Sequence, residues 1–124
     1  LTFTTVSKSN EILGVNIVRG LQTAISSLYK NTAKLPTIEI ELPDKVIGKN
    51  TVHSIQSGIM FGYVGLVKEM LDKIKSELTG KTKVIATGGL SKFAKPLKSY
   101  FNDILPTLTL DGMIKILDKN NKKK

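Results

Sequence analysis

The sequence predicts an α/β domain with a mixed sheet and flanking helices, and three observations lead to this prediction. Two β-favouring segments, 1–6 and 11–18, open the chain on either side of a polar turn, which is typical of a hairpin. Strand-like and helix-like segments then alternate as far as the C-terminal region. Segment 83–86 runs into two glycines and then into a helical pattern, as strands do in layered α/β proteins. An antiparallel start followed by this alternation implies a sheet with both kinds of strand pairing.

Composition limits the class of protein. The 124 residues, 40% hydrophobic and 23% charged, are sufficient for one globular domain with a core of its own. The chain has no cysteine and a single histidine, His53, which argues against disulfides and against thiolate or histidine zinc sites. Apolar runs are shorter than the roughly 18 to 20 residues of a membrane helix, and no signal-peptide pattern is present. We therefore expect a cytoplasmic protein with no membrane partner.

The net charge of +9 does not by itself indicate a nucleic-acid partner. The basic residues are almost all lysines spread along the chain, with Arg19 as the exception and a lysine run only at 122–124. The seven aromatic residues are not interleaved with them, as they would be on a single-strand binding surface. A solvated lysine surface is the simpler interpretation, and an anionic small ligand such as a nucleotide is compatible with the charge.

The first half of the chain contains two predicted helices. Segment 21–30 places Leu21, Ala24, Ile25 and Leu28 on one helical face, and segment 37–42 alternates like a short edge strand or an extended loop. Asn50 or Thr51 can cap a long helix over 52–78. The apolar positions that predict this helix step by three or four residues: Val52, Ile55, Ile59, Tyr63, Val67, Met70, Ile74 and Leu78.

The second half begins at Gly80, which can end the long helix. We expect a strand over 83–86, a helix over 92–101 and a last short strand over 105–110. Asp111 can then cap a final helix over 112–117. These elements predict one domain over residues 1–118, followed by a basic tail over 119–124.

Three glycines in the long helix, Gly58, Gly62 and Gly65, require a reason, because each costs about 1 kcal/mol relative to alanine. Close approach of another backbone is the usual one. The partner could be a neighbouring helix of this chain or the same helix of a second subunit. Direct contact with a ligand is the alternative.

The turn Thr87-Gly88-Gly89 is the candidate binding element. A ligand can lie directly against glycine backbone, and free N–H groups at the start of the following helix can face an anion. The alternative is a strand-to-helix turn whose glycines only provide a positive φ. In sheets of this kind, ligands lie beyond the carboxyl ends of strands, where this turn is expected.

Five motifs, in order and with suitable spacing, give the chain a family resemblance. They are Thr32-Ala33-Lys34-Leu35-Pro36, Ile47-Gly48-Lys49-Asn50-Thr51, Ile55-Gln56-Ser57-Gly58 with Gly62, Ala86-Thr87-Gly88-Gly89-Leu90, and Leu108-Thr109-Leu110-Asp111-Gly112. Over nearly its whole length the chain resembles the C-terminal half of a type III pantothenate kinase.

This resemblance implies the RNase-H-like lobe shared by acetate and sugar kinases, heat-shock chaperone ATPases and actin. It implies a bacterial homodimer that uses ATP with Mg2+, and a monovalent cation (K+ or NH4+), to phosphorylate pantothenate in coenzyme A biosynthesis. Thr87, Gly88 and Gly89 match the family's adenosine motif. Thr51 matches a threonine that reaches pantothenate bound in the neighbouring subunit, although it can also be a simple helix cap.

The resemblance also assigns a dimer interface. Gly14, Ile17, Gly20 and Leu21 match the family's interface motif, in which Val15 here replaces a glycine and Arg19 replaces a proline. These two replacements put the details of the dimer contact in question.

The catalytic motifs of the family lie outside this sequence. They are an Asp-x-Gly-Asn-Thr turn, a Gly-x-Asp-Arg segment and an Asp-x-Gly-Thr-Ala turn, which belong to the first half or lie just before Leu1. Thr2 fits the residue after the last turn, but Thr4 stands where the family often has Asp. The chain's own acids read as turn, cap or solvent-facing residues: Glu39, Glu41, Asp44, Asp72, Asp103, Asp111 and Asp118. We therefore expect no catalytic residue in this chain and a need for an N-terminal lobe or partner chain.

Two other hypotheses remain open. A non-catalytic relative could keep this lobe as a nucleotide-binding or regulatory module. An unrelated α/β nucleotide or nucleic-acid binder is the third, and it would show binding that weakens steeply with salt and is indifferent to ATP.

Overall fold

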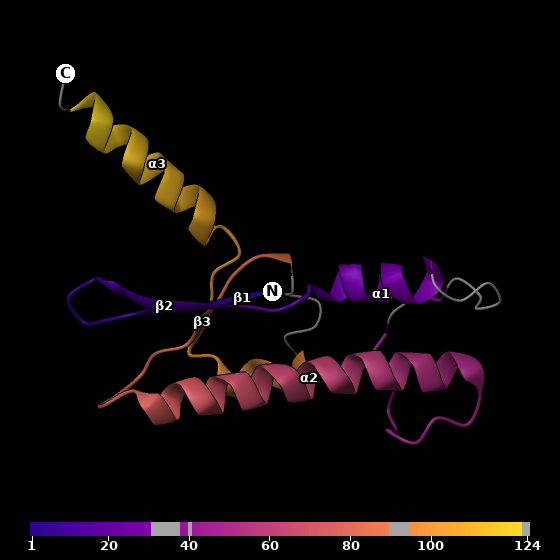
Figure 1. Cartoon of the computed structure of the whole chain (residues 1–124). Coiled ribbons are helices and arrows are strands. Elements are labelled where there is room, and N and C mark those ends of the chain that lie inside the picture. Colours follow the sequence, from indigo (N-terminus) through magenta and orange to yellow (C-terminus); the bar gives the residue numbers. More distant parts are fainter. Residues whose placement is uncertain (31–37, 40, 90–94, 123–124) are drawn as a thin grey trace. The chain divides into compact units, whose positions relative to one another are not determined.

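The computed structural model describes residues 1–30, 38–39, 41–89 and 95–122. The chain divides into two compact units, Leu1–Glu69 and Met70–Lys124. Figure 1 shows the order of the elements along the chain. The motif at 32–36 and Leu90 lie outside the described residues.

The first unit opens with the predicted hairpin. Strands β1 (Thr2–Val6) and β2 (Ile12–Ile17) pair antiparallel, with a bulge between Thr5 and Val6. Asn10 adopts a positive φ of 63° in the turn, a conformation that asparagine tolerates better than most residues. The Leu1 amino group donates to the Val18 carbonyl over 2.9 Å and continues the pairing beyond the strand ends.

Two helices supply most of the buried residues of this unit. Helix α1 (Leu21–Lys30) has the predicted bounds, and α2 (Thr51–Glu77) differs from its prediction by one residue at each end. Helix α2 belongs to this unit up to Glu69, and its last turns belong to the second unit. Leu21 and Ile25 on α1, Ile38 in the loop, and Met60, Val64 and Val67 on α2 are buried. The Tyr63 hydroxyl on α2 donates a hydrogen bond to the Arg19 carbonyl just before α1. Burial raises the pKa of Tyr63, while the positive charge of Arg19 acts in the opposite direction.

The buried face of α2 is rotated from the predicted one. The predicted stripe began at Val52, which is 41% exposed, whereas Met60 is only 2% exposed. Apolar residues occur around much of this helix, so that two overlapping rows both have helical spacing. Only Val67 belongs to the predicted row and to the most buried one.

The loop before α2 is fastened to the first turns of that helix by side chains. The Asn50 side chain accepts the His53 backbone N–H over 2.9 Å, so Asn50 rather than Thr51 caps α2. His53 Nε2 lies 2.8 Å from the Lys45 carbonyl oxygen, and Gln56 donates to the Glu39 carbonyl over 2.8 Å. The buried Ser57 hydroxyl donates to the Val46 carbonyl. No strand forms among the described residues of the predicted segment 37–42, and residues 37 and 40 lie outside the described part.

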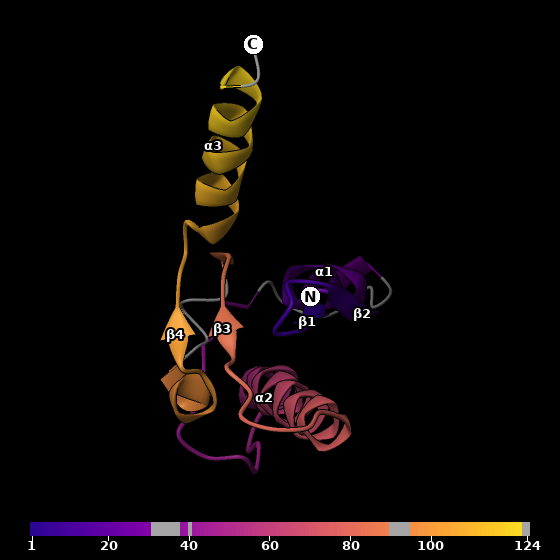
Figure 2. The same ribbon diagram turned by 90° about the vertical axis from the view of Figure 1, so that its left-hand side faces the viewer.

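The second unit contains a short parallel pair. Strands β3 (Ile85–Ala86) and β4 (Asp103–Ile104) lie side by side, and their arrows point the same way in Figure 2. The predicted strand 83–86 is thus half as long as expected. Of the predicted helix 92–101, Lys95–Tyr100 forms a 3₁₀ helix with Leu97 buried, and residues 92–94 lie outside the described part.

The prediction of a last strand over 105–110 is wrong. Residues 105–107 lead through a turn into α3 (Leu108–Asn121), so residues 108–110 of the predicted strand are helical. This helix begins four residues earlier and ends four residues later than predicted. Alternating Thr and Leu suggested a strand, but Leu110, Met113, Ile114 and Leu117 continue a helical row through the same region. Thr107 occupies the N-cap position, and Asp111, predicted as the cap, lies in the first turn. Residues 119–121 of the predicted tail are helical.

The described residues form a mixed α/β structure with both kinds of pairing, but in two separate two-stranded sheets rather than one mixed sheet. Within this part of the chain, no helix has the length and apolarity required to cross a membrane.

Candidate functional site

The turn Thr87-Gly88-Gly89 follows β3 directly, as predicted. Because β3 and β4 are parallel, their carboxyl ends meet at one edge, and the Leu105 N–H donates to the Ala86 carbonyl over 2.8 Å there. The turn therefore shares this edge with residues 105–107, which lead into the N-terminus of α3 (Figure 2). All three residues of the turn are exposed.

The two glycines of this turn have different local roles. Gly88 has a φ of +88°, which by itself explains a glycine at that position. Gly89 has no such φ, and a Cβ built on it would meet no atom of the described residues within 4 Å. Backbone strain therefore accounts for Gly88, while Gly89 leaves open backbone that a ligand could approach.

This edge carries both positive and negative charge. A helix N-terminus carries partial positive charge from its free N–H groups, and α3 begins here at Leu108. The carboxylate of Asp111 occupies the first turn and accepts the Thr107 hydroxyl over 3.0 Å, which offsets part of that charge. Such an edge suits an uncharged nucleoside better than a free phosphate.

Thr51 is the first residue of α2 and is exposed. Since Asn50 provides the cap, the threonine side chain is not required for that purpose. Its hydroxyl has no hydrogen bond to any described residue. The fastened loop described above holds Thr51 at a fixed place at the start of the helix.

The predicted interface residues lie in the first unit and differ in exposure. Gly14 and Ile17 are on β2, where the Ile17 side chain is 83% exposed. Gly20 precedes α1, and its missing Cβ would lie 3.7 Å from the Leu1 nitrogen. Leu21 is only 5% exposed and belongs to the core of the unit.

The glycines of α2 have no close neighbour within the described chain. Gly58, Gly62 and Gly65 are exposed, and a Cβ at each would meet nothing within 4 Å. Packing against another helix of this chain is therefore not observed in the described part. A second subunit or a ligand are the alternatives that stay open.

The acidic residues do not form a metal site in the described part of the chain, where no three His, Asp or Glu side chains group together. Asp103 instead lies 3.6 Å from the Lys83 ammonium group on the surface.

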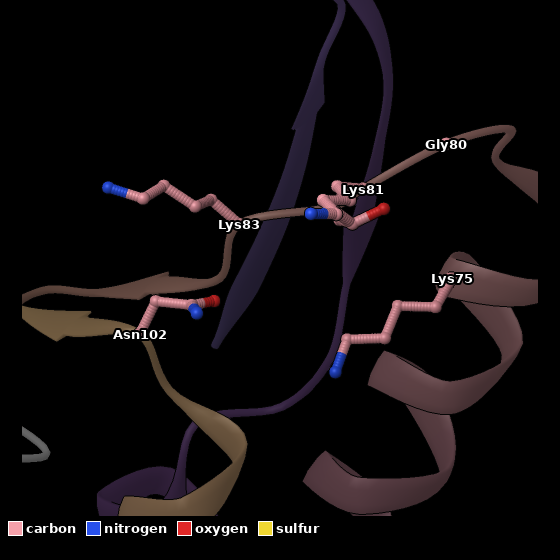
Figure 3. A pocket seen from close by; sticks show the side chains of 6 residues that line it. Lys75, Gly80, Lys81, Lys83 and Asn102 are labelled. Atoms are coloured by element: carbon pink, nitrogen blue, oxygen red, sulfur yellow. The ribbon is translucent and has the colours of Figure 1, made fainter.

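One cavity was not predicted from the sequence. It is lined by Lys75, Gly80, Lys81, Thr82, Lys83 and Asn102, and not by the glycine turn (Figure 3). The segment Gly80-Lys81-Thr82-Lys83 was visible in the sequence as a basic stretch after a helix end. The approach of Asn102 to it depends on the pairing of β3 with β4, which no local pattern specifies.

Comparison with known proteins gives consistent matches. The sequence model of the type III pantothenate kinase family matches residues 1–73. A type III pantothenate kinase of Dehalococcoides mccartyi (strain CBDB1) is 43% identical over 119 residues, which cover 96% of this chain and 45% of that protein. The enzymes of that name from Koribacter versatilis and Finegoldia magna are 42% and 43% identical, covering 96% and 98% of this chain and 43% and 47% of theirs. The chain thus spans less than half the length of these curated relatives.

Proposed function

Because this chain belongs to the type III pantothenate kinase family, we propose that it forms the C-terminal lobe of a pantothenate kinase. The complete protein would transfer the γ-phosphoryl group of ATP to pantothenate, with Mg2+ and a monovalent cation (K+ or NH4+), in coenzyme A biosynthesis. The fold proposed for the lobe is RNase-H-like, and its proposed location is the cytoplasm.

In this proposal the turn Thr87-Gly88-Gly89 holds the nucleoside of ATP. The observation that carries this step is the open backbone at Gly89, where neither φ nor packing in the described residues explains a glycine. A flat ring can approach such backbone more closely than it can approach any residue with a side chain. The shared edge at the carboxyl ends of β3 and β4 is where ligands lie in related sheets.

The chemistry is assigned to an N-terminal lobe. Phosphoryl transfer requires acids that bind Mg2+ and orient the attacking hydroxyl. The sequence motifs that carry these acids in the family have no counterpart in this chain. Thr51 would contact pantothenate of the neighbouring subunit in a homodimer built through Gly14, Ile17, Gly20 and Leu21.

An assembly assay tests the proposal. The chain is combined with the N-terminal half of the Dehalococcoides mccartyi relative, and ATP-dependent formation of phosphopantothenate is measured. We expect no product from the chain alone and product from the combination. Substitution of Gly89 by valine should raise the KM for ATP by about tenfold or more, because a side chain occupies the place of the nucleoside. The matched control is Gly112→Val in α3, which should leave that KM unchanged.

Two results would contradict the proposal. Product formed by the chain alone would place the catalytic acids within it. A combination that assembles but makes no product, and binds ATP equally with and without the Gly89 substitution, would remove the assigned role of the turn. A combination that binds ATP through Gly89 but makes no product would favour the second candidate, a non-catalytic nucleotide-binding or regulatory relative.

A further inference from the structure

The lysine-lined cavity in the second unit lies at the opposite end of β3 from the glycine turn. Residues 80–83 lead into the strand, whereas Thr87-Gly88-Gly89 leave it. Each residue of a strand advances about 3.3 Å, so a nucleoside held at the turn is separated from the cavity by the strand itself. The cavity is therefore a separate place on this unit.

Its lining contains several hydrogen-bond donors. Lys75, Lys81 and Lys83 contribute ammonium groups, and no carboxylate belongs to the lining. Asn102 uses its side-chain oxygen to accept the Val84 N–H over 2.7 Å, which leaves its NH2 group available as a donor. The Thr82 hydroxyl and the backbone N–H groups of residues 80–82 have no hydrogen bond to any described residue. Ammonium groups and unpaired donors in a lining without a carboxylate suit an anion.

Two of the three lysines carry the positive charge of the cavity. Lys83 extends away from the other two in Figure 3, and its charge is partly offset by Asp103 at 3.6 Å. Lys75 comes from the last turn of α2, where its ammonium group lies 5.9 Å from the centre of the Tyr100 ring. No described carboxylate lies within ion-pair distance of Lys75 or Lys81. The contact with the Tyr100 ring leaves the charge of Lys75 in place.

One contribution opposes anion binding. The carboxyl end of α2 carries roughly half a negative charge, which is directed toward this region. Two full positive charges at Lys75 and Lys81 exceed it, and lysine in the last helical turn also compensates the helix end directly. The charges of these two lysines therefore exceed the opposing contribution of the helix end.

We propose that this cavity binds the phosphate groups of a small phosphate-bearing anion, with Lys75 and Lys81 as the charged contacts and Thr82 and Asn102 as neutral donors. The cavity volume of about 480 Å³ admits a diphosphate. The proposal does not depend on the kinase function, since it uses none of the residues assigned to ATP or pantothenate.

Titration of the full chain with inorganic pyrophosphate at physiological salt, followed by backbone amide NMR, tests the proposal. We expect saturable shifts at residues 80–83 and a Kd below about 1 mM. Lys81→Gln and Lys75→Gln should each raise that Kd at least about fivefold, while Lys81→Arg should change it by less than about threefold, since arginine keeps the charge. The matched control is Lys115→Gln, an exposed lysine on α3, which should have no effect. Amide spectra of the variants also report whether each remains folded.

Two further ligands separate this site from the proposed nucleotide site. Adenosine lacks phosphate and should shift the signals of the glycine turn but not those of residues 80–83. If adenosine does not shift the signals of the glycine turn, the nucleoside role of the turn is contradicted, and the anion proposal is unaffected. ADP should reach the cavity only through its diphosphate, so shifts at residues 80–83 with ADP but none with pyrophosphate would overturn the proposal. Pyrophosphate shifts that grow linearly without saturation would overturn the proposal as well. So would a Lys115→Gln variant that weakens pyrophosphate binding as much as Lys75→Gln or Lys81→Gln.

Discussion

Tyr63 is a single residue that connects two segments far apart in the sequence. Its hydroxyl donates to the Arg19 carbonyl, and burial raises its pKa above the usual value near 10. The folded chain therefore keeps this proton to a higher pH than the unfolded chain does. The stabilisation is complete below pH 10 or so and is lost as the pH rises through the folded pKa.

Substitution of Tyr63 by phenylalanine tests this linkage. At neutral pH we expect a loss of about 0.5–1.5 kcal/mol in the free energy of unfolding, because one hydrogen bond is removed. As the pH rises above 10 toward the folded pKa, the difference between the two proteins should shrink, because ionisation of the buried Tyr63 hydroxyl destabilises only the wild-type fold. Urea unfolding at a series of pH values measures both effects. Parallel curves for the two proteins would show that the Tyr63 proton is not linked to folding.

Gly48 is required by close contact rather than by conformation. A Cβ there would clash with the Ser54 hydroxyl oxygen and would lie 2.6 Å from the Ser54 Cα, which is backbone and cannot rotate away. Gly48→Ala should lower the free energy of unfolding by about 1–3 kcal/mol, as overpacking usually does. Urea unfolding measures the loss, with Gly58→Ala as the control because that position faces open space. An unchanged midpoint for Gly48→Ala would mean that the loop moves without cost.

At the scale of elements, Met60 on α2 and Met113 on α3 give a matched comparison. Met60 is 2% exposed, while Met113 is 61% exposed. Met60→Ala should cost about 2–5 kcal/mol, because it removes buried apolar surface and leaves a cavity. Met113→Ala should change the stability by less than about 0.5 kcal/mol, as surface substitutions do. Thermal unfolding followed by circular dichroism distinguishes the two, and equal losses would contradict the assignment of the core to α2.

The glycines of α2 lead to a prediction with two readouts. Gly62→Ala should stabilise the isolated chain by about 1 kcal/mol, since the new methyl group meets nothing within 4 Å and alanine favours helix. If these glycines contact a second subunit, the same substitution should weaken self-association in sedimentation experiments. A destabilised monomer would show instead that a segment of this chain packs against them.

Elements with strong local signals were predictable from the sequence. The hairpin has a polar turn between β-favouring segments, and α1 and α2 have long apolar periodicity, so that their bounds agree with the structure to within one residue. The region 105–110 was not predictable in this way, because Leu110 fits both an alternating strand pattern and the helical row of α3. Local periodicity also left the rotation of α2 undetermined, since its apolar residues are not confined to one face.

The two candidate sites also differ in whether local sequence could predict them. The turn at Thr87 could be located because its glycines follow a strand in the sequence. The cavity at Lys75 and Lys81 could not, because it requires β3 to pair with β4 and so depends on residues about twenty positions apart. Nonlocal pairing of this kind leaves no periodic trace.

At the scale of the whole molecule, the exposed apolar residues are the feature that bears on self-association. Ile12 and Ile17 on the hairpin are 70% and 83% exposed, and the helical row of α3 at Leu110, Met113, Ile114 and Leu117 is 58–61% exposed. Exposed apolar patches of this kind mark contacts with other chains or segments. The net charge of +9 opposes self-association, because copies of the chain repel one another. Salt weakens this repulsion, and the screening length is about 8 Å at physiological ionic strength.

We therefore predict that the chain self-associates, and that it does so more strongly as salt is added. The double variant Ile12→Thr/Ile17→Thr should associate more weakly, because threonine keeps the preference for strand while it removes apolar surface. Its thermal midpoint should change little, since both side chains are largely exposed in the folded chain. Sedimentation velocity over a range of protein and salt concentrations measures the association, and Lys8→Arg in the hairpin turn, which keeps the net charge, is the control for a change outside the apolar patch. A wild-type chain that stays monomeric at high salt would show that these residues are tolerated in water and do not form a contact surface.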